Sequence, residues 1–319
     1  MILISLLLLN NVFFNLIDSD IKLEKGYFSH IRSYFVANHT PHHNGYNEIY
    51  TVGEKINIKA KFQYGDLRKD LEDENILIYH LNLNDDKNKY EYITEVKTND
   101  DGKINYVFEK KSEMGFHLFK LIVKGDLSEA NVLIHVIDKK SNNKYVVFDI
   151  DGTLTVSDKE ISKEYYFELV DVNYSPKMYE NAVDIVNYYY EKGYNILYLT
   201  ARPYWLSSNS QKWLDLNKFP KGILITYPQS GIILGEKVKN FKYNILKSLK
   251  DKGIDFQFAY GNAKTDISAY SDLGLKKEQI FIIGKNNEDK KITPVETYTK
   301  HLKELKKWRK QKKTNGFVT

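Results

Sequence analysis

Residues 144–155 read KYVVFDIDGTLT, a short apolar run that ends at two aspartates separated by one residue. The run at 145–148 has no polar interruption, as expected for a parallel strand that is buried on both faces of its sheet. Gly152 follows the second aspartate and allows the chain to turn sharply out of the strand. This stretch therefore predicts the central strand of an α/β sheet, with Asp149 and Asp151 at its carboxyl end.

The sequence after residue 155 alternates between helical and strand-like segments. Helices are expected at 179–192, 205–216 and 241–250, and strands at 194–199, 222–226, 256–260 and 280–283. Such alternation is typical of a doubly wound α/β layer with a parallel sheet. Ligands bind sheets of this kind beyond the carboxyl ends of the strands.

Five residues at strand ends or helix starts have the chemistry of a phosphoryl-transfer site. Asp149 can attack phosphorus and form an acyl phosphate, and Asp151 can protonate the leaving oxygen and later take a proton from water. Thr200 and Ala201 close the second strand, where the threonine hydroxyl can hold a phosphate oxygen. Lys242 is expected to open a helix and to neutralise charge on the phosphoryl group. Each could be an ordinary loop residue, but their shared placement favours a catalytic site.

Residues 261–266 read GNAKTD and close the strand at 256–260. Asn262 and Asp266 in this stretch bring oxygen donors, which Mg²⁺ prefers in proteins. The chain has no cysteine, so disulfides, thiolate metal sites and cysteine nucleophiles are excluded. The sequence thus points to a magnesium-dependent site rather than to thiol chemistry.

The part of the chain before residue 144 has a different pattern. Short strands are expected at 56–62, 76–81, 104–108, 116–123 and 132–136, with polar turns between them. This spacing predicts an all-β sandwich that resembles an immunoglobulin-type module. The segment has no catalytic constellation, so we expect a scaffold or interaction role for it.

A histidine cluster lies in the irregular stretch 21–45. It consists of His39, His42 and His43, which could bind a metal. The loop-like surroundings favour a solvated linker instead.

The first residues of the chain, 1–14, are almost wholly apolar. The run is short for a membrane span and fits the core of a signal peptide; a buried N-terminal helix or strand is the alternative. We expect a secreted or endomembrane-lumenal protein with possible peripheral membrane association, and a cytosolic location is less favoured.

Residues 300–313 contain eight Lys or Arg and one Glu. On a helix, Leu302, Leu305 and Trp308 would form an apolar strip beside a cationic face, as in helices that bind anionic membranes. A solvated charged tail is the alternative. The net charge of +5 comes mostly from this end, and no nucleic-acid recognition motif accompanies it, so nucleic acid is not expected as a partner.

The α/β motifs resemble those of the haloacid dehalogenase (HAD) superfamily. They are more similar to the LNS2 domain, which the lipins share with the C-terminal region of the Nir2/RdgB phosphatidylinositol transfer proteins. The resemblance covers residues 145–284 and rests on DIDGTLT at 149–155, YLTARP at 198–203, KFPKG at 218–222, YGN at 260–262, DISAY at 266–270 and QIFIIG at 279–284. It implies a HAD-like fold. About forty residues separate Asp151 from the second strand, and about as many separate Arg202 from Lys242, which leaves no room for a large cap domain. An uncapped site suits a substrate presented by a surface, such as a lipid headgroup.

Two residues place this chain between the branches of that family. Asn262 stands where much of the superfamily has an aspartate, as in the lipins, and the neutral amide weakens metal affinity without abolishing oxygen coordination. Asp149 is present, whereas the Nir2/RdgB group typically lacks this nucleophile and binds phosphatidic acid without hydrolysing it. The lipin-like chemistry is therefore intact in this sequence.

The resemblance implies a Mg²⁺-dependent phosphatidate phosphatase that acts through an aspartyl-phosphate intermediate. In this interpretation Asp149 is the nucleophile, Asp151 the acid and base, and Thr200, Ala201 and Lys242 bind phosphate. The alternative is a non-catalytic module of the Nir2/RdgB kind that binds phosphatidic acid or phosphoinositide in lipid transfer. A phosphatase for another phosphoester is the third candidate.

The implied metal shell consists of the Asp149 carboxylate, the Asp151 backbone carbonyl and Asn262, with Asp266 orienting it.

The expected organisation of the chain is a signal peptide at 1–17, a linker at 18–45, a β-sandwich at 46–140, a HAD-like LNS2 domain at 144–290 and a basic helix or tail at 294–319.

Overall fold

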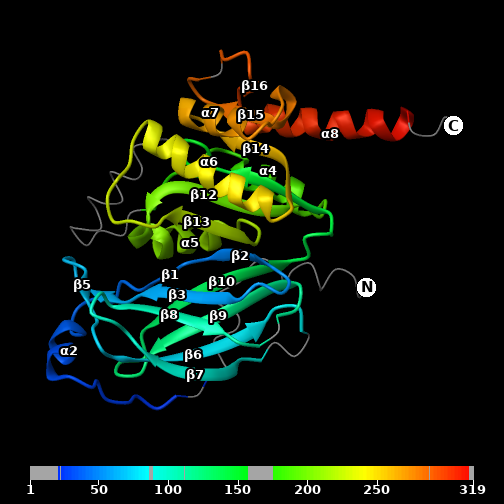
Figure 1. Ribbon diagram of the computed structural model, residues 1–319. Helices are drawn as coiled ribbons and strands as arrows, with labels where there is room; N and C mark the ends of the chain where they lie inside the picture. Colours follow the sequence, from blue (N-terminus) through cyan, green and yellow to red (C-terminus); the bar gives the residue numbers. More distant parts are fainter. Residues whose placement is uncertain are drawn as a thin grey trace. The chain divides into compact units, whose positions relative to one another are not determined.

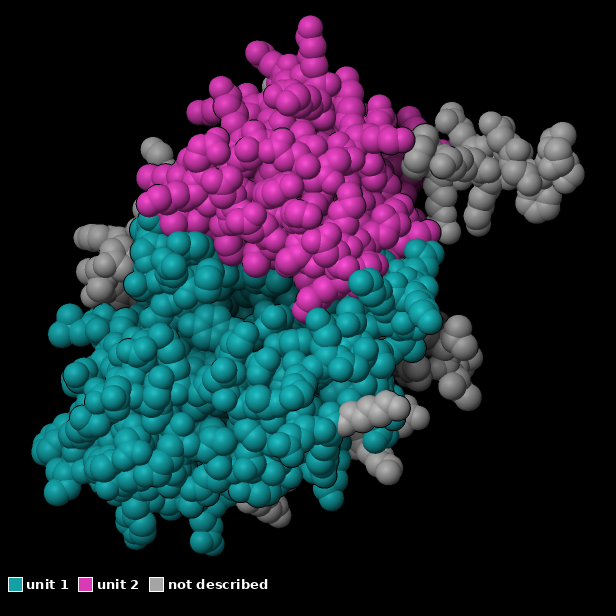
Figure 2. All heavy atoms as spheres, viewed as in Figure 1, with its two compact units in different colours: residues 1–143, 202–215, 223–232 teal, residues 144–201, 216–222, 233–319 magenta. Residues whose placement is uncertain are grey.

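The computed structural model describes residues 21, 23–85, 89–110, 112–156, 175–286 and 288–315, of which 308–315 by their backbone alone. The chain divides into two compact units, which Figure 2 colours separately. The first comprises residues 1–143, 202–215 and 223–232, and the second comprises residues 144–201, 216–222 and 233–319. The KYVVFDIDGTLT stretch lies in the second unit.

The first unit contains a β-sandwich (Figure 1). Its elements in chain order are α2 (Ile31–Val36), β1 (Asn44–Gly45), β2 (Glu48–Thr51), β3 (Ile56–Lys61), β4 (Gln63–Tyr64), β5 (Lys69–Asp70), β6 (Asn75–Asn82), β7 (Glu91–Lys97), β8 (Lys103–Phe108), β9 (Gly115–Val123) and β10 (Glu129–Ile137). One sheet has the order β2-β10-β9-β6-β7 and the other β1-β3-β8, while β4 and β5 pair with each other. The predicted all-β sandwich is confirmed.

Alternation along the strands sets the sandwich core. In β3, Ile56, Ile58 and Ala60 are buried, while the side chains between them are partly exposed. Phe119 of β9 and Val132 of β10 belong to the same buried cluster. Because successive strand residues point to opposite faces, the period of two read from the sequence decides which side chains enter the core.

The α/β part of the chain is built on a six-stranded sheet (Figure 1). Its elements are β11 (Asn143–Phe148), α4 (Ala182–Tyr190), β12 (Asn195–Pro203), η1 (Tyr204–Leu206), α5 (Ser207–Leu216), β13 (Gly222–Tyr227), α6 (Glu236–Asp251), β14 (Ile254–Gly261), α7 (Lys264–Asp272), η2 (Lys277–Gln279), β15 (Ile280–Ile283), β16 (Thr293–Val295) and α8 (Tyr298–Asn315). The strand order is β13-β12-β11-β14-β15-β16. The chain order therefore reverses between β11 and β14, which is the switch point where such sheets bind ligands.

The central strand is as buried as its sequence predicts. All four side chains at 145–148 are 0% exposed, and β11 pairs in parallel with β12. The Phe148 ring stacks on Tyr260 of β14 at 4.7 Å, and Tyr260 stacks on Phe281 of β15 at 4.9 Å. Three neighbouring strands are thus held by aromatic contacts directly below the edge that carries the polar motifs.

Some elements differ from the sequence-based expectation. β7 has almost no buried side chain, so it lacks the apolar alternation of a sandwich strand. α7 and the three-residue β16 were not expected either. α6 begins at Glu236, so Lys242 lies in its second turn and does not open the helix. The helix expected over the basic C-terminal segment is present as α8.

Two expectations concern residues outside the described ranges. The first is the signal peptide at 1–17. The second is the absence of a cap domain, because residues 157–174, which lie between the DIDGTLT stretch and β12, are outside the described ranges. No helix among the described residues is long and apolar enough to cross a membrane.

One member of the histidine cluster, His43, does not lie in a solvated linker, whereas His39 is exposed. His43 is 5% exposed, and its ring contacts Phe62 and Tyr64. Its Nδ1 accepts the amide of Gln63 at 3.2 Å, so Nε2 carries the proton and donates to Ser128 Oγ at 2.8 Å. The neutral ring therefore links Gln63 and Ser128 by hydrogen bonds within the sandwich core.

Buried histidines make the folded protein sensitive to acid. Burial lowers the pKa of His43 from 6.5 to about 4, against an opposing effect of the Asp126 charge. Between these values the unfolded chain binds a proton that the folded chain does not, so stability falls as the pH drops from 6.5 to about 4. These two pKa values correspond to a loss of about 2 kcal/mol at pH 5 for this one residue.

Urea unfolding at pH 7 and pH 5 should show this loss. We expect His43→Gln to reduce the pH-dependent loss by about 2 kcal/mol. His39→Gln, which replaces an exposed histidine, should leave the loss unchanged. Equal pH dependence in wild type and His43→Gln would contradict the assignment.

Candidate phosphate and metal site

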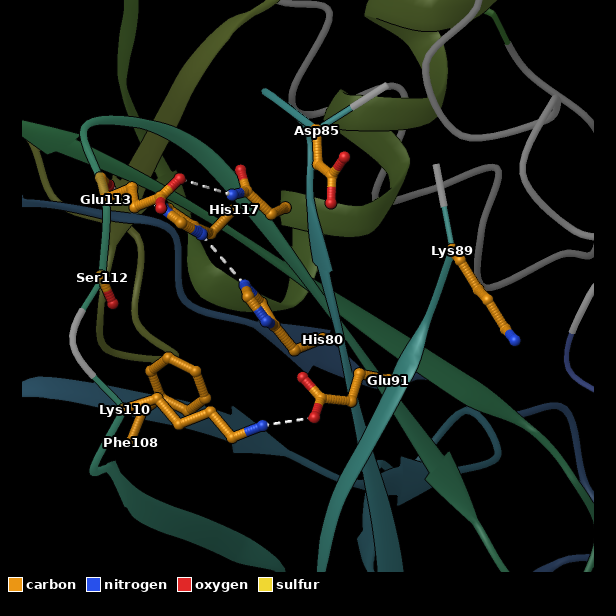
Figure 3. A pocket seen from close by; sticks show the side chains of 10 residues that line it. His80, Asp85, Lys89, Glu91, Phe108, Lys110, Ser112, Glu113 and His117 are labelled. Carbon is orange, nitrogen blue, oxygen red and sulfur yellow. Dashed lines mark hydrogen bonds and ion pairs between the residues drawn. The ribbon is translucent and has the colours of Figure 1, made fainter. Parts of the chain in front are cut away.

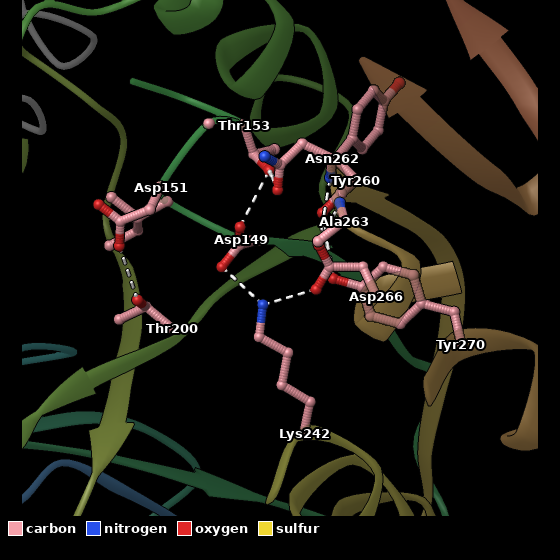
Figure 4. Close-up of polar contacts among 12 residues, drawn as sticks. Asp149, Asp151, Thr153, Thr200, Lys242, Tyr260, Asn262, Ala263, Asp266 and Tyr270 are labelled. Atoms are coloured by element: carbon pink, nitrogen blue, oxygen red, sulfur yellow. Dashed lines mark hydrogen bonds and ion pairs between the residues drawn. The ribbon is translucent and has the colours of Figure 1, made fainter. Parts of the chain in front are cut away.

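The two aspartates leave the sheet through a tight turn at the end of β11 (Figure 4). The Asp149 amide donates to the Tyr260 carbonyl at 3.0 Å, so this residue still belongs to the sheet edge. Gly152 has φ 69°, a left-handed conformation that suits glycine. The amides of Leu154 and Thr155 both donate to the Ile150 carbonyl, at 2.8 and 3.0 Å. The turn aims the Asp149 side chain into the site and fixes the residues after it.

A buried ammonium group joins two of the predicted site residues. Lys242 Nζ, from α6, lies 2.7 Å from Asp149 Oδ1 and 2.6 Å from Asp266 Oδ1. The three side chains are 3%, 6% and 0% exposed, in that order. An ion pair this deep requires well-formed hydrogen bonds to offset desolvation, and the two short contacts supply them. Lys242 therefore bridges the first motif to the last.

The electrostatics of this cluster leave an excess of negative charge. Burial raises the pKa of Asp149; Lys242 opposes the rise, and the charges of Asp266 and Asp151 add to it. Burial would lower the pKa of Lys242, but the charges of Asp149 and Asp266 outweigh it and the net direction is upward. Lys242 therefore stays cationic beside three formal carboxylates, and a divalent cation would balance the site.

The donor atoms at this edge fit magnesium. Thr153 Oγ1 donates to Asp149 Oδ2 at 3.0 Å and lies 3.5 Å from Asn262 Oδ1, so these two oxygens converge on one hydroxyl. Mg²⁺ takes such hard oxygen donors and retains several waters. Among the described residues no cluster of three His, Cys, Asp or Glu side chains is arranged to hold a metal. The shell would therefore rest on Asp149, on Asn262 and on the predicted carbonyl of Asp151.

Asp266 has an orienting position in the structure. It is the third residue of α7, and its Oδ2 accepts the amides of Asn262 and Ala263 at 3.1 Å each. Its Oδ1 accepts from Lys242, so both carboxylate oxygens have hydrogen-bond partners. Gly261 makes this approach possible, because a Cβ there would lie 2.5 Å from Asp266 Cβ. The loop that carries Asn262 is thereby attached to the start of α7.

Two of the three phosphate-binding candidates, Thr200 and Ala201, lie on β12. Thr200 is 1% exposed and lies within β12, three residues before the strand ends at Pro203, and its hydroxyl donates to Asp151 Oδ2 at 3.3 Å. Ala201 follows it on the same strand. Thr200 and Ala201 therefore do not close their strand, contrary to the expectation from the sequence, because β12 continues to Pro203. The predicted neighbourhood of Thr200 and Asp151 is nevertheless present.

Two residues of this site were not given a role from the sequence. Thr153 belongs to the quoted motif, yet its contact with Asp149 depends on the turn after Gly152. Tyr298 donates from its hydroxyl to the Thr153 carbonyl at 2.8 Å across a separation of 145 residues. The threonine was visible as part of DIDGT, whereas nothing in the local pattern marks the tyrosine.

A separate pocket of about 240 Å³ lies within the β-sandwich (Figure 3). His117 Nε2 lies 2.8 Å from the Glu113 carbonyl and must donate to it, so Nδ1 accepts from His80 Nε2 at 3.0 Å. Burial lowers the pKa of His80 to about 4, with His117 adding to the shift. The paired rings are neutral near pH 7. Charged side chains of both signs also line the pocket, including Glu91 and Lys110.

The sheet order and the DxDGT turn at the switch point define an HAD-like α/β domain, preceded by a β-sandwich. Comparison with protein families makes this more specific. Residues 146–284 match the family described as PITM 1-3, LNS2 domain, and residues 41–136 match PITM 1-3, beta-sandwich domain. The chain therefore carries an LNS2 domain of the Nir2/RdgB type together with the β-sandwich of the same proteins, and the resemblance seen in the sequence is confirmed.

Curated relatives agree with this assignment. Protein retinal degeneration B of Drosophila melanogaster is 28% identical over 254 residues, which cover 78% of this chain and 19% of that protein. Human membrane-associated phosphatidylinositol transfer protein 2 is 28% identical over 258 residues, covering 78% and 18%. Mouse membrane-associated phosphatidylinositol transfer protein 3 is 30% identical over 197 residues, covering 61% and 18%. This chain thus spans about a fifth of the length of these relatives.

The Lys242 bridge generates a stability prediction. Lys242→Met removes the cation but leaves Asp149 and Asp266 buried together, which we expect to cost about 3–5 kcal/mol of unfolding free energy. Lys239→Met is the matched control, since Lys239 lies one turn earlier on α6 and pairs with Asp272 nearer the surface. Urea unfolding measures both, and comparable effects of the two substitutions would show that the buried bridge has no special role.

Proposed function

We propose that the LNS2 domain of this chain binds the phosphomonoester headgroup of an anionic lipid, phosphatidic acid first among them. The main support for this proposal is that Thr200, Lys242 and the oxygen donors Asp149 and Asn262 lie at one switch point. A hydroxyl, an ammonium group and a magnesium ion are suitable partners for a dianionic phosphate. The relatives, whose names describe membrane-associated phosphatidylinositol transfer proteins, support a lipid ligand.

Helix α8 supports peripheral contact with a membrane. Lys303, Lys306 and Lys307 are exposed, and Leu302 and Leu305 are half-buried. The Leu305 carbonyl accepts from the Tyr188 hydroxyl of α4 at 3.0 Å, so part of the expected apolar strip packs on the domain. Each basic residue near an anionic bilayer contributes about 1 kcal/mol. A secreted or lumenal location remains an expectation from residues 1–17, which the relatives' names do not support.

The buried residues of α8 determine where the chain can be shortened to test its basic end. A cut after Val295 would remove Tyr298 and His301, which are buried in the domain. A chain ending at Lys307 keeps them and loses four of the eight basic residues at 300–313. We expect this chain to bind anionic vesicles at least tenfold more weakly, with unchanged affinity for water-soluble dioctanoyl phosphatidic acid.

Raised salt should reproduce the effect of the cut in a vesicle sedimentation assay, because surface attraction is screened over about 8 Å at physiological ionic strength. Vesicle binding that responds to neither treatment would make the end of α8 a solvated segment.

A specific observation also favours a second candidate, phosphatidate hydrolysis. Asp149 is present, and Lys242 and Thr153 hold its carboxylate in place. One carboxylate oxygen would form a bond to phosphorus as the ester oxygen leaves with a proton from Asp151. Asp151 would then take a proton from the water that cleaves the aspartyl phosphate. Mg²⁺, when bound, would neutralise charge on the phosphoryl oxygens.

Two substitutions separate binding from hydrolysis. Asp149→Asn removes the nucleophile and should abolish phosphate release from phosphatidic acid vesicles in Mg²⁺. Asp151→Asn removes the proton donor and should slow release about a hundredfold or more. Binding of dioctanoyl phosphatidic acid in Mg²⁺, measured by calorimetry, should be unchanged in Asp151→Asn. In Asp149→Asn it should be weaker but still measurable, because one oxygen donor for the metal is lost while Thr200 and Lys242 remain. Wild-type protein that binds the lipid and releases no phosphate would reject hydrolysis and leave the binding function standing.

A further inference from the structure

The first turn of α8 lies against the candidate site, although it is outside the matched LNS2 residues 146–284. Tyr298 is 1% exposed, and its hydroxyl donates to the Thr153 carbonyl at 2.8 Å. Its ring contacts Tyr260 and Tyr179, with centroids 6.4 and 6.0 Å apart. The side chain is therefore fully enclosed by the α/β domain and directed at the turn that carries the aspartates.

Thr153 is the residue through which this contact reaches the site. Its hydroxyl donates to Asp149 Oδ2 and lies beside Asn262 Oδ1, so the orientation of its backbone sets the position of a group that touches both predicted metal ligands. Its amide is 3.2 Å from the Ile150 carbonyl, at the long end of hydrogen bonding. The Tyr298 hydroxyl provides a shorter hydrogen bond, to the carbonyl of the same residue.

A second contact ties α8 to the other half of the site. His301 Nε2 lies 2.8 Å from Tyr260 Oη, which in turn lies 2.8 Å from Tyr189 Oη. Tyr260 is the strand residue whose carbonyl accepts the Asp149 amide. Two consecutive turns of α8 thus support both segments that meet at the switch point.

We propose that Tyr298 is a positioning residue of the phosphate and metal site, and that the folded unit of this site extends to the first two turns of α8. The hydroxyl fixes the Thr153 peptide, and the Thr153 hydroxyl then holds the Asp149 carboxylate in line with Asn262. The ligand named in the test rests on the proposed function; the positioning itself does not.

Tyr298→Phe tests the hydroxyl alone, because the ring and its packing remain. Tyr198→Phe is the matched control: Tyr198 is also 1% exposed, and its hydroxyl donates to the Pro220 carbonyl at 2.8 Å, away from Thr153. Both variants lose one buried hydrogen bond of the same kind, so their losses of stability should be similar. A structural role alone would make them alike in every other measurement.

Hydrogen exchange provides a readout that needs no ligand. We expect amides 152–155 to exchange about threefold to tenfold faster in Tyr298→Phe than in wild type, the range that corresponds to one lost hydrogen bond. Tyr198→Phe should leave their exchange unchanged. Calorimetry with dioctanoyl phosphatidic acid and Mg²⁺ should show a loss of affinity of similar size for Tyr298→Phe only.

Thr153→Val supplies the second variant, and on its own it should lower the affinity for dioctanoyl phosphatidic acid in Mg²⁺, a result that can be measured even if Tyr298→Phe does not fold stably. It removes the hydroxyl that links Tyr298 to Asp149, so adding Tyr298→Phe to it should cause no further loss of affinity. Equal exchange at 152–155 in the Tyr298→Phe and Tyr198→Phe proteins would overturn the inference. Wild-type protein that binds no phosphatidic acid would reject the proposed function, while the exchange comparison would still decide the role of Tyr298.

Discussion

The organisation of the α/β domain depends on one buried interaction, the ammonium group of Lys242 between the carboxylates of Asp149 and Asp266. Removing the lysine would leave two buried anions, and removing either aspartate would take away a partner that offsets its desolvation. The bridge connects β11, α6 and α7, so three elements distant in sequence are fixed by one charge. Their geometry at the switch point is therefore a condition of folding as well as of the proposed ligand binding.

The sequence was sufficient for the frame of the site. Residues 145–148 are uninterrupted and fully buried, and parallel strands bring their carboxyl ends to one edge regardless of loop detail. Asp149 was therefore expected at the sheet edge, where the structure has it. Thr200 was expected to close its strand, but β12 continues to Pro203. The period of two in β3 was equally informative for the sandwich.

The remaining features depend on contacts that no local pattern encodes. His43 stands in a polar, irregular stretch, yet it pairs with Gln63 and Ser128 in the sandwich core. The start of α6 has a weak apolar period. The sequence therefore predicted that Lys242 opens the helix, whereas the helix begins at Glu236. The Tyr298 contact spans 145 residues. The basic residues of α8 predict an exposed, charged helix and do not indicate that its first turn is buried. These are effects of tertiary structure on residues whose local signals point elsewhere.

Gly261 has a consequence for recognising this arrangement in other chains. No larger side chain fits beside Asp266, so the glycine and the aspartate five positions later must be retained together wherever the Asn262 loop keeps its shape. Asp149 is under no such steric requirement. Loss of Asp149 with retention of this pair would indicate a chain that keeps the loop geometry without the candidate nucleophile, whereas loss of the pair would indicate that the loop itself has changed. The glycine is thus a sequence marker of geometry, independent of the marker of chemistry.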